Sequence, residues 1–287
     1  MVASDSLPSC RVDADADAAA ALALSDAAGW NQTAQDWALF SRHGQVLGRR
    51  DDTYGELVAT AAALPYGGAQ GWISMVLVHK DWRHRGLASA LMGESVAWLR
   101  GAGITPILDA TPAGQAVYRR LGFEPGMAFE RWQRSPTPAP TRGPHDAGVT
   151  RVAGSADLPA LTALDAAASG VHRSFLIEAF LARGDTRAWM LRDGSGFVLA
   201  RAGRRAVQVG PLVATDTAGA LALLGAALAT LPGAVFVDAV TRHTQLAAWL
   251  HAHGFSSQRP FVRMALGDAA ALHGGAGQYL VAGPEFG

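Results

Sequence analysis

The sequence predicts an α/β protein of the α+β kind, built from two similar domains. Its 287 residues exceed a typical small domain and fit two domains of ordinary size. Residues 135–148 form a proline-rich stretch with nothing to bury, which is typical of an extended linker. The order of strands and helices before this linker is repeated after it. We therefore expect a flexible leader (1–10), a first domain (11–134), the linker, and a second domain (149–287).

Composition and charge exclude several classes of protein. Lys plus Arg and Asp plus Glu both total 24, so no net field attracts nucleic acid or an anionic membrane. The single cysteine, Cys10, can form no intrachain disulfide. The N-terminal residues are acidic rather than signal-like, and no apolar run is long enough to cross a bilayer. We expect a soluble cytoplasmic protein, monomeric or homodimeric, with neither nucleic acid nor membrane as a partner.

The first half opens with two helices and two strands. Small apolar and acidic residues alternate from Asp13 to Ala28 and indicate a helix. Gly29-Trp30-Asn31 indicates a loop that leads into a second helix at Trp37. Strands are expected at about residues 45–49 and 56–64, because a polar, Gly-containing connection separates two apolar runs there.

Residues 71–99 combine a strand, a basic turn and a helix. Large and β-branched residues dominate from Trp72 to Val78, which indicates a buried strand. Helix begins near Gly86, after which an apolar stripe recurs at helical spacing as far as Leu99. Gly101-Ala102-Gly103 ends this helix.

The turn before that helix has the chemistry of a phosphate-binding loop. The free N–H groups of a first helical turn point outward and carry the positive end of the helix dipole. Arg83 and Arg85 lie beside them, and Gly86 and Ala88 are small where an anion must approach the backbone. A diphosphate would satisfy all of these groups, whereas the alternative is a solvated basic turn before an ordinary surface helix.

The first half closes with a strand, a helix and further strands. Residues 106–110 form a short apolar strand. Thr111 and Pro112 then provide a cap and a first-turn proline for a helix that ends at Gly122. Apolar and aromatic residues at 123–133 indicate the closing strands.

Two motifs resemble those of a known family. Arg83-x-x-Gly86-x-Ala88, after a strand, resembles the acyl-CoA-binding motif of the GNAT superfamily of N-acyltransferases. Tyr118-x-x-Leu-Gly-Phe123 resembles a second motif that is common in GNAT domains. The resemblance implies two GNAT-like domains, each with a mixed, mostly antiparallel sheet flanked by helices. It also implies acetyl-CoA as cosubstrate, and no metal.

The resemblance assigns residues to the cofactor and to the chemistry. Tyr118 would lie near the CoA sulfur and protonate the leaving thiolate, a role that suits a neutral phenol. A strand N–H, from Val76 or its neighbour, would steady the oxyanion. The expected cofactor-binding residues are Val76, Leu77, Val78, Arg83, His84, Arg85, Gly86, Leu87, Ala88 and Ser89.

The base and the acceptor site are less closely specified. A base or a water chain must deprotonate the amine, and Asp109 is the first candidate for the base, with His79, Glu56 and Asp36 as alternatives. Each of these four also has a solvated or structural interpretation. In GNAT proteins the region of Trp30 and Trp37 borders the acceptor, so both are predicted to contact substrate, the alternative being core packing.

The second half repeats the plan but lacks both motifs. After a strand ending near Val213, the turn Ala214-Thr215-Asp216-Thr217 has no Arg-x-x-Gly-x-Ala pattern. An acid, Asp216, stands where a diphosphate would have to lie, and Leu250 stands at the position that matches Tyr118. We therefore expect an active first domain and a degenerate second domain, as in tandem GNAT acetyltransferases, with two active sites as the rival interpretation.

The predicted activity is acetyl transfer from acetyl-CoA to the primary amine of a small molecule, by direct attack on the thioester. A second domain beside the site is expected to narrow access, which makes acetylation of protein or peptide amino groups the alternative within the same chemistry. A non-catalytic acyl-CoA sensor is the alternative from another class.

Overall fold

The computed structural model describes residues 7–13, 15–136, 150–267 and 273–287. Most of the predicted leader (1–6) and most of the predicted linker (137–148) lie outside the described residues. The chain forms two compact units, Met1–Ile107 and Leu108–Gly287. Their boundary falls within strand β5 (Thr105–Ala110), so that one strand contributes to both.

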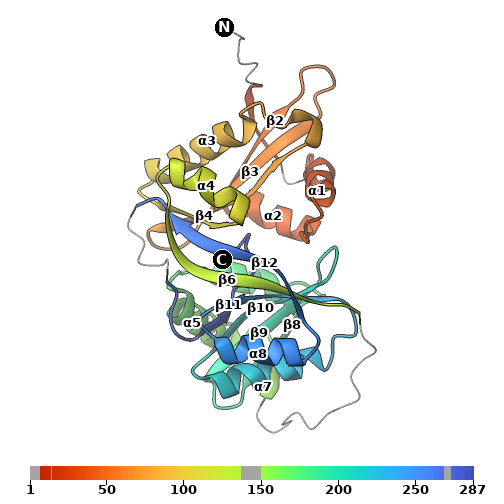
Figure 1. Ribbon diagram of the computed structural model, residues 1–287, viewed down its shortest axis with the longest axis vertical. Coiled ribbons are helices and arrows are strands. Elements are labelled where there is room, and N and C mark those ends of the chain that lie inside the picture. Colours follow the sequence, from red (N-terminus) through yellow and green to blue (C-terminus); the bar gives the residue numbers. More distant parts are fainter. Residues whose placement is uncertain (1–6, 14, 137–149, 268–272) are drawn as a thin grey trace. The chain divides into compact units, whose positions relative to one another are not determined.

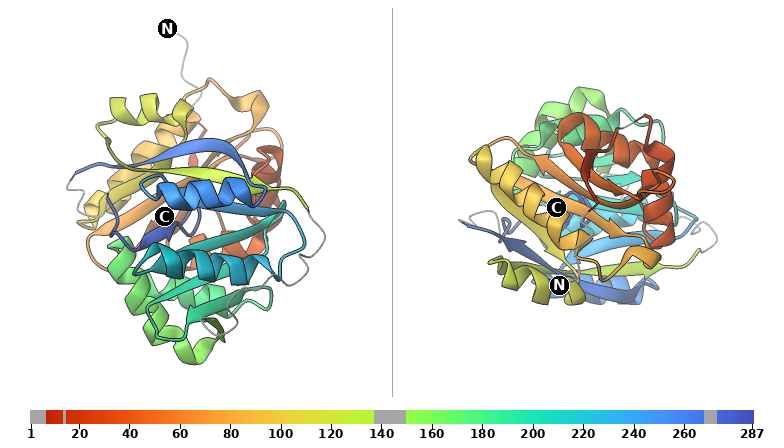
Figure 2. Two further views of the ribbon diagram at one scale, coloured as in Figure 1. Left: turned by 60° about the horizontal axis from the view of Figure 1, so that its bottom comes forward. Right: turned by 90° about the horizontal axis from the view of Figure 1, so that it is seen from above.

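The first unit contains a mixed, mostly antiparallel sheet with the order β1-β2-β3-β4-β5. Only the β4–β5 pair is parallel. Helices α1 (Ala18–Ala27) and α2 (Ala34–His43) lie on one face, and α3 (Leu87–Gly101) lies on the other (Figures 1 and 2). The strands before β5 are β1 (Ser9–Arg11), β2 (Gln45–Arg50), β3 (Leu57–Pro65) and β4 (Gln70–Val78). Ser9 and Cys10, expected in the leader, therefore already belong to β1.

Small residues let α3 pack closely on this sheet. Leu87 and Leu91 of α3 share an apolar cluster with the fully buried Ala59 and Ala61 of β3. A polar contact adds to this packing, because Glu94 of α3 accepts hydrogen bonds from Arg49 of β2 and from Ser9. The apolar stripe predicted for α3 thus faces the sheet. This packing holds the helix, and with it its N-terminus, in one orientation relative to the strands.

The second unit has the sheet order β12-β6-β11-β13-β10-β9-β8-β7. Helices α7 and α8 pack on one face around a large apolar cluster, and α5 lies on the other face (Figures 1 and 2). The strands are β6 (Glu124–Arg134), β7 (Thr150–Ala153), β8 (Arg187–Leu191), β9 (Gly196–Arg201), β10 (Val207–Ala214), β11 (Val235–Val240), β12 (Ser256–Ala265) and β13 (Gln278–Leu280). The helices are α4 (Pro112–Arg120), α5 (Leu158–Ser169), α6 (Ser174–Leu181), α7 (Thr217–Leu228) and α8 (Thr244–Ala252).

Strand β6 is the reason why the two compact units do not coincide with the two halves of the sequence repeat. It precedes the linker, yet it lies between β11 and β12, which follow the linker. Phe129 of β6 stands opposite Phe261 of β12, and their rings stack with centroids 5.1 Å apart. Residues 108–134 therefore belong with the second unit, although the repeat of elements assigns them to the first half.

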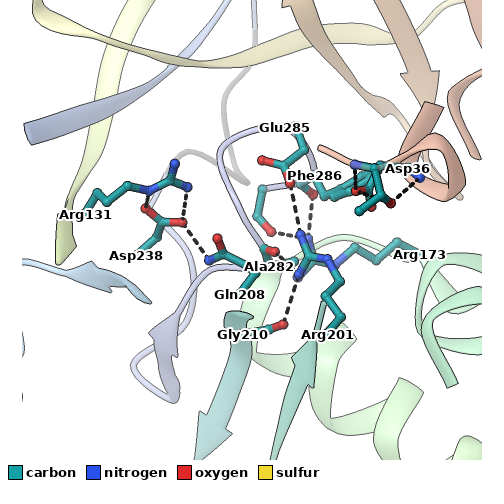
Figure 3. A network of polar contacts seen from close by, with 12 residues as sticks. Asp36, Arg131, Arg173, Arg201, Gln208, Gly210, Asp238, Ala282, Glu285 and Phe286 are labelled. Carbon is teal, nitrogen blue, oxygen red and sulfur yellow. Dashed lines mark hydrogen bonds and ion pairs between the residues drawn. The ribbon is translucent and has the colours of Figure 1, made fainter. Parts of the chain in front are cut away.

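Two buried ion pairs join residues from before and after the linker. Arg131 of β6 donates to both carboxylate oxygens of Asp238 on β11, at 2.8 and 2.7 Å. Arg263 of β12 donates to both oxygens of Asp109 on β5, at 3.0 and 3.2 Å. These pairs occupy matching positions in the repeat, and Gln208 adds a third hydrogen bond to Asp238 at 2.9 Å (Figure 3).

Within the described parts of the chain, no helix is both long and apolar enough to cross a membrane.

Candidate functional site

The start of α3 is an open helix N-terminus. Gly86 is its N-cap, no side chain accepts a hydrogen bond there, and the first turn contains no acidic residue. Ala90 N bonds back to Gly86 O at 3.0 Å. The three preceding amides, from Leu87 to Ser89, have no acceptor within the helix. They carry the positive end of the helix dipole and suit an anion.

The turn before α3 depends on left-handed backbone conformations. Gly86 has φ of +78°, and a Cβ atom built there would meet nothing within 4 Å. Glycine is therefore favoured by the backbone angle rather than by lack of space. His84 also has positive φ, 64°, although it is not glycine. Such strain costs about 1–3 kcal/mol and is concentrated at functional sites in proteins.

The two arginines of the turn differ in their surroundings. Arg85 lies over the Trp82 ring, 4.4 Å from its centroid, and donates to Asp81 O at 3.2 Å. Arg83 is exposed, and its Nε is 3.5 Å from Val78 O, a distance at the limit of hydrogen bonding. Among the described residues, neither guanidinium has an ion-pair partner. Arg83 is therefore the more readily available cation for a ligand.

Strand β4 carries an irregularity next to this turn. The register between β3 and β4 shifts between Thr60 and Ala62. Met75 has φ of 52°, and its carbonyl oxygen accepts a hydrogen bond from the Thr60 hydroxyl at 2.9 Å. On the opposite edge, the parallel ladder with β5 ends at Trp72. In the described structure the β5 edge of β4 thus has no strand partner from residue 73 on, which includes Val76–Val78.

Tyr118 lies in the second unit, on α4, and is half-buried. Its ring packs on Phe123, with centroids 6.0 Å apart. A Cβ at Gly114 would come within 2.9 Å of the ring, so Gly114 leaves room for it. Burial raises the pKa of the Tyr118 phenol above its ordinary value of 10.0. The phenol therefore keeps its proton at neutral pH.

Asp109 is held as an ion-pair partner. Its side chain is fully buried, and both of its oxygens are occupied by Arg263. A general base must be free to approach the proton that it removes. The pairing therefore favours a structural role for Asp109 over the predicted role as base.

Two of the three alternative bases, Asp36 and His79, also make local hydrogen bonds. The Asp36 carboxylate accepts from the Thr33 N–H at 2.7 Å, and the pair forms the capping box of α2. Glu56 is exposed beside β3. His79 is half-buried at the end of β4, where its Nδ1 accepts from Asp81 N at 3.4 Å. Of these, His79 alone combines partial exposure with a position next to the basic turn.

The two tryptophans lie in different environments. Trp37 is buried, and its Nε1 donates to the Ser25 hydroxyl at 3.2 Å. Its ring also meets Phe40 edge-on, with centroids 6.2 Å apart. Trp30 is half-buried in the loop before α2. Trp37 therefore fits the core-packing alternative, and Trp30 remains the better candidate for contact with substrate.

Sequence reasoning missed three features. Gly114 had a signal, since a glycine inside a helix often indicates close packing. The left-handed Met75 had none, because neither its residue type nor its neighbours predict positive φ. Strand β13 (Gln278–Leu280) was also missed, because its three residues are too few for a periodic pattern.

The start of α7 is the counterpart of the start of α3 in the second half. Asp216 is its N-cap, and the carboxylate accepts from Gly219 N at 2.8 Å. Only Thr215 and Asp216 separate β10 from α7, whereas residues 79–86 separate β4 from α3. Leu250, which matches Tyr118, is fully buried in the apolar cluster of the second unit. Neither position retains the groups that the first half offers.

In the described residues there is no cluster of three or more His, Cys, Asp or Glu side chains that could hold a metal ion.

Comparison with known proteins gives two matches to family models. Residues 16–123 match the model described as Acetyltransferase (GNAT) family, and residues 161–276 match one described as Acetyltransferase (GNAT) domain. The first match contains β4, the basic turn and α4, and the second contains the start of α7. No curated protein matched the chain in a sequence search.

Solved structures resemble the chain over nearly its full length. A presumed acetyltransferase from Pyrococcus horikoshii has a TM-score of 0.79 at 18% sequence identity, and the match covers 98% of this chain and 95% of that one. A GCN5-related N-acetyltransferase from Kribbella flavida has a TM-score of 0.58 at 23% sequence identity, and the match covers 93% of this chain and 73% of that one. A tandem GNAT protein from the clavulanic acid biosynthesis pathway has a TM-score of 0.62 at 16% sequence identity, and the match covers 90% of this chain and 97% of that one. At these identities the likeness shows the fold.

Proposed function

Because this chain belongs to the GNAT acetyltransferases and carries two such domains in tandem, we propose that it transfers an acetyl group from acetyl-CoA to the primary amine of a small molecule. We further propose that the first half carries the chemistry and that the second half binds no acyl-CoA.

The open start of α3 is the observation that carries this proposal. Its unsatisfied amides, the glycine at Gly86 and the available Arg83 guanidinium together offer an anion both hydrogen bonds and positive charge. The CoA diphosphate has the matching charge and acceptor oxygens. The unpaired edge of β4 next to it offers backbone groups to an extended, amide-containing arm such as pantetheine.

The proposed reaction is a direct transfer without a covalent enzyme intermediate. The neutral amine attacks the thioester carbonyl, a backbone N–H near Val76 stabilises the oxyanion, and the C–S bond then breaks as the carbonyl re-forms. The amine loses one proton to a base or a water chain, and the CoA thiolate gains one from Tyr118. The base is not Asp109 in this scheme, because its carboxylate is committed to Arg263; His79 is the proposed candidate.

The test is acetyl-CoA-dependent release of free thiol against a panel of small amines, amino acids, polyamines and peptides. We expect turnover with a small primary amine and little with peptides. Preferential turnover of peptides would favour acetylation of protein amino groups. Tight binding of acetyl-CoA without turnover of any acceptor would favour the non-catalytic sensor.

Gly86→Glu provides the matching binding test. Its carboxylate would lie beside the α3 amides, so calorimetry is expected to detect no acetyl-CoA binding. An unchanged dissociation constant would remove the diphosphate site from the start of α3, and with it the main support for the proposal.

A further inference from the structure

Strand β13 lies in an opening between β10 and β11 of the second half. These two strands pair directly, in parallel, only where Val207–Val209 meet Val235–Val237. Beyond that point β13 enters between them: Leu280 stands opposite Leu212 of β10 and opposite Ala239 of β11. In the repeated plan, β10 and β11 correspond to β4 and β5. The position of β13 thus matches the free edge of β4.

The same segment also covers the start of α7. The Tyr279 hydroxyl is 3.1 Å from the hydroxyl of Thr217, the first residue of α7. The Tyr279 ring stacks on His243, with centroids 3.9 Å apart, and His243 Nε2 lies 2.9 Å from Gln278 O. Arg242 donates to His273 O at 2.7 Å and to Gly275 O. Residues 273–279 therefore lie close to the helix start that Asp216 caps.

Two buried arginines hold the end of the segment. Arg201 donates to Ala282 O at 2.6 Å and to Glu285 at 2.9 Å. Arg173 donates to Phe286 O at 2.7 Å (Figure 3) and to Gly287 O. Opening this segment would leave two buried guanidinium groups without these carbonyl acceptors, which is costly in a low-dielectric interior.

The anchoring extends to the core. Asp165 of α5 accepts hydrogen bonds from Arg173 through both carboxylate oxygens, at 2.7 and 2.9 Å, so the arginine is also held by a helix of the second unit. The Phe286 ring meets Phe180 edge-on, with centroids 5.4 Å apart. Leu280 and Phe286 are fully buried. The segment is thus packed as part of the core rather than laid on the surface.

We propose that residues 273–287 are a resident peptide ligand of the second half, occupying the place between β10 and β11 that corresponds to the acyl-carrier site proposed for the first half. The strand takes the place of the pantetheine arm, and Asp216 with Tyr279 takes the place of the diphosphate. This inference rests on the proposed function for the location of the acyl-carrier site. Its consequence is that the second half keeps its fold without CoA, and that each chain binds one acyl carrier.

The experiment cuts the chain while leaving the segment in place. A protease recognition sequence with a Gly-Ser spacer is inserted after Gly267, the full chain is purified and cleaved, and the product is passed through a native sizing column. We expect residues 273–287 to remain bound through the column, also in millimolar acetyl-CoA, and to separate in denaturant. Release of the segment on the native column, or release by acetyl-CoA with uptake of a second equivalent, would overturn the proposal.

Variants show whether the observed contacts hold the segment. Arg201→Gln is expected to weaken retention of the cleaved segment by about tenfold or more, because it removes charge-assisted hydrogen bonds. Arg192→Gln, on an exposed neighbour, is the matched control and should retain it fully. Since Arg201→Gln can impair folding, Tyr279→Phe serves as a milder variant, for which we expect a few-fold loss. Equal retention in all four proteins would overturn the assignment.

The same cleaved protein separates the two proposals. Calorimetry with acetyl-CoA reports on the first half, whereas retention of the segment reports on the second. Loss of all acetyl-CoA binding with full retention would refute the proposed function alone. One equivalent bound with immediate release of the segment would refute this inference alone.

Discussion

The starts of α3 and α7 occupy the same position in the repeated plan, yet they offer opposite chemistry to an anion. α3 begins at a left-handed glycine with no capping side chain and with Arg83 beside it. α7 begins at Asp216, whose carboxylate already satisfies one of the free amides. The strands and helices around the two are alike. The difference shows that the same helix position can be left open or closed by one capping carboxylate while the fold is retained.

A second difference concerns the strand edges. β4 leaves its β5 side open beyond Trp72, whereas β10 has β13 in the corresponding place. An open edge is a template for hydrogen bonding with another extended chain. The first half therefore has a strand edge available for an extended ligand. In the second half, β13 occupies the corresponding edge.

The largest effect is expected when α3 receives the carboxylate that α7 has. Gly86→Asp would place a negative charge at the helix start, and repulsion of the diphosphate should weaken acetyl-CoA binding by about 100-fold or more, measured by calorimetry. Gly86→Asn is the control, since Asn and Asp both tolerate the left-handed conformation. Equal losses in the two variants would show that shape, rather than charge, distinguishes the two helix starts.

Tyr118 and Leu250 are the next matched pair. Tyr118→Phe removes the phenolic proton, and kcat is expected to fall about 100-fold while the affinity for acetyl-CoA is unchanged. Because burial raises the pKa of this phenol above 10.0, its proton should be available at every lower pH, so this group gives the wild-type enzyme no alkaline decline below about pH 10. Tyr54→Phe, at an exposed tyrosine, is the control. Unchanged kcat in Tyr118→Phe would assign the ring to packing.

The two arginines of the turn should differ by a smaller factor. Arg83→Gln is expected to weaken acetyl-CoA binding about tenfold, through loss of a charge-assisted hydrogen bond. Arg85→Gln should weaken it about two- to threefold, because Arg85 is already engaged by Trp82 and Asp81 O. Titration of both variants under one salt condition measures the ratio. A reversed order would mean that Arg85 leaves Trp82 when the ligand binds.

The smallest effect is expected in the second half. Asp216→Ala removes the N-cap of α7 and should lower the free energy of unfolding by about 1 kcal/mol, measured in urea. It should not create a second acetyl-CoA site, because β13 still fills the opening between β10 and β11. Binding of a second equivalent in this variant would make the carboxylate, rather than the strand, the element that closes the second half.

Local features of both halves could be predicted from sequence because their causes are local. The glycine at Gly86 and the acid at Asp216 each act on the helix that follows them within one turn. The strand and helix at residues 72–99 likewise follow from apolar spacing, and the helix begins at Leu87, one residue after the expected start.

Features that depend on distant partners could not be predicted. Asp109 lies near the end of an apolar strand, which made it one of several candidates for the base, but its carboxylate is bound by Arg263, 154 residues later. Apolar alternation in β6 shows which of its faces is buried but not that β11 and β12 are its neighbours. The spacing of Trp37 in the sequence did not indicate that its ring nitrogen donates a hydrogen bond to the Ser25 hydroxyl in the core.

The ion pair between Asp109 and Arg263 has a consequence for synthesis of the protein. The two residues are 154 positions apart, and a ribosome adds about 5–20 residues per second, so Asp109 is made about 8–30 s before its arginine. For that time Asp109, next to the last residue of β5, has no partner to be buried with, and β6 is made before β11 and β12. Completion of this part of the molecule therefore waits until β12 has been made, and nascent chains stalled before β12 should be more susceptible to protease or bound by chaperones.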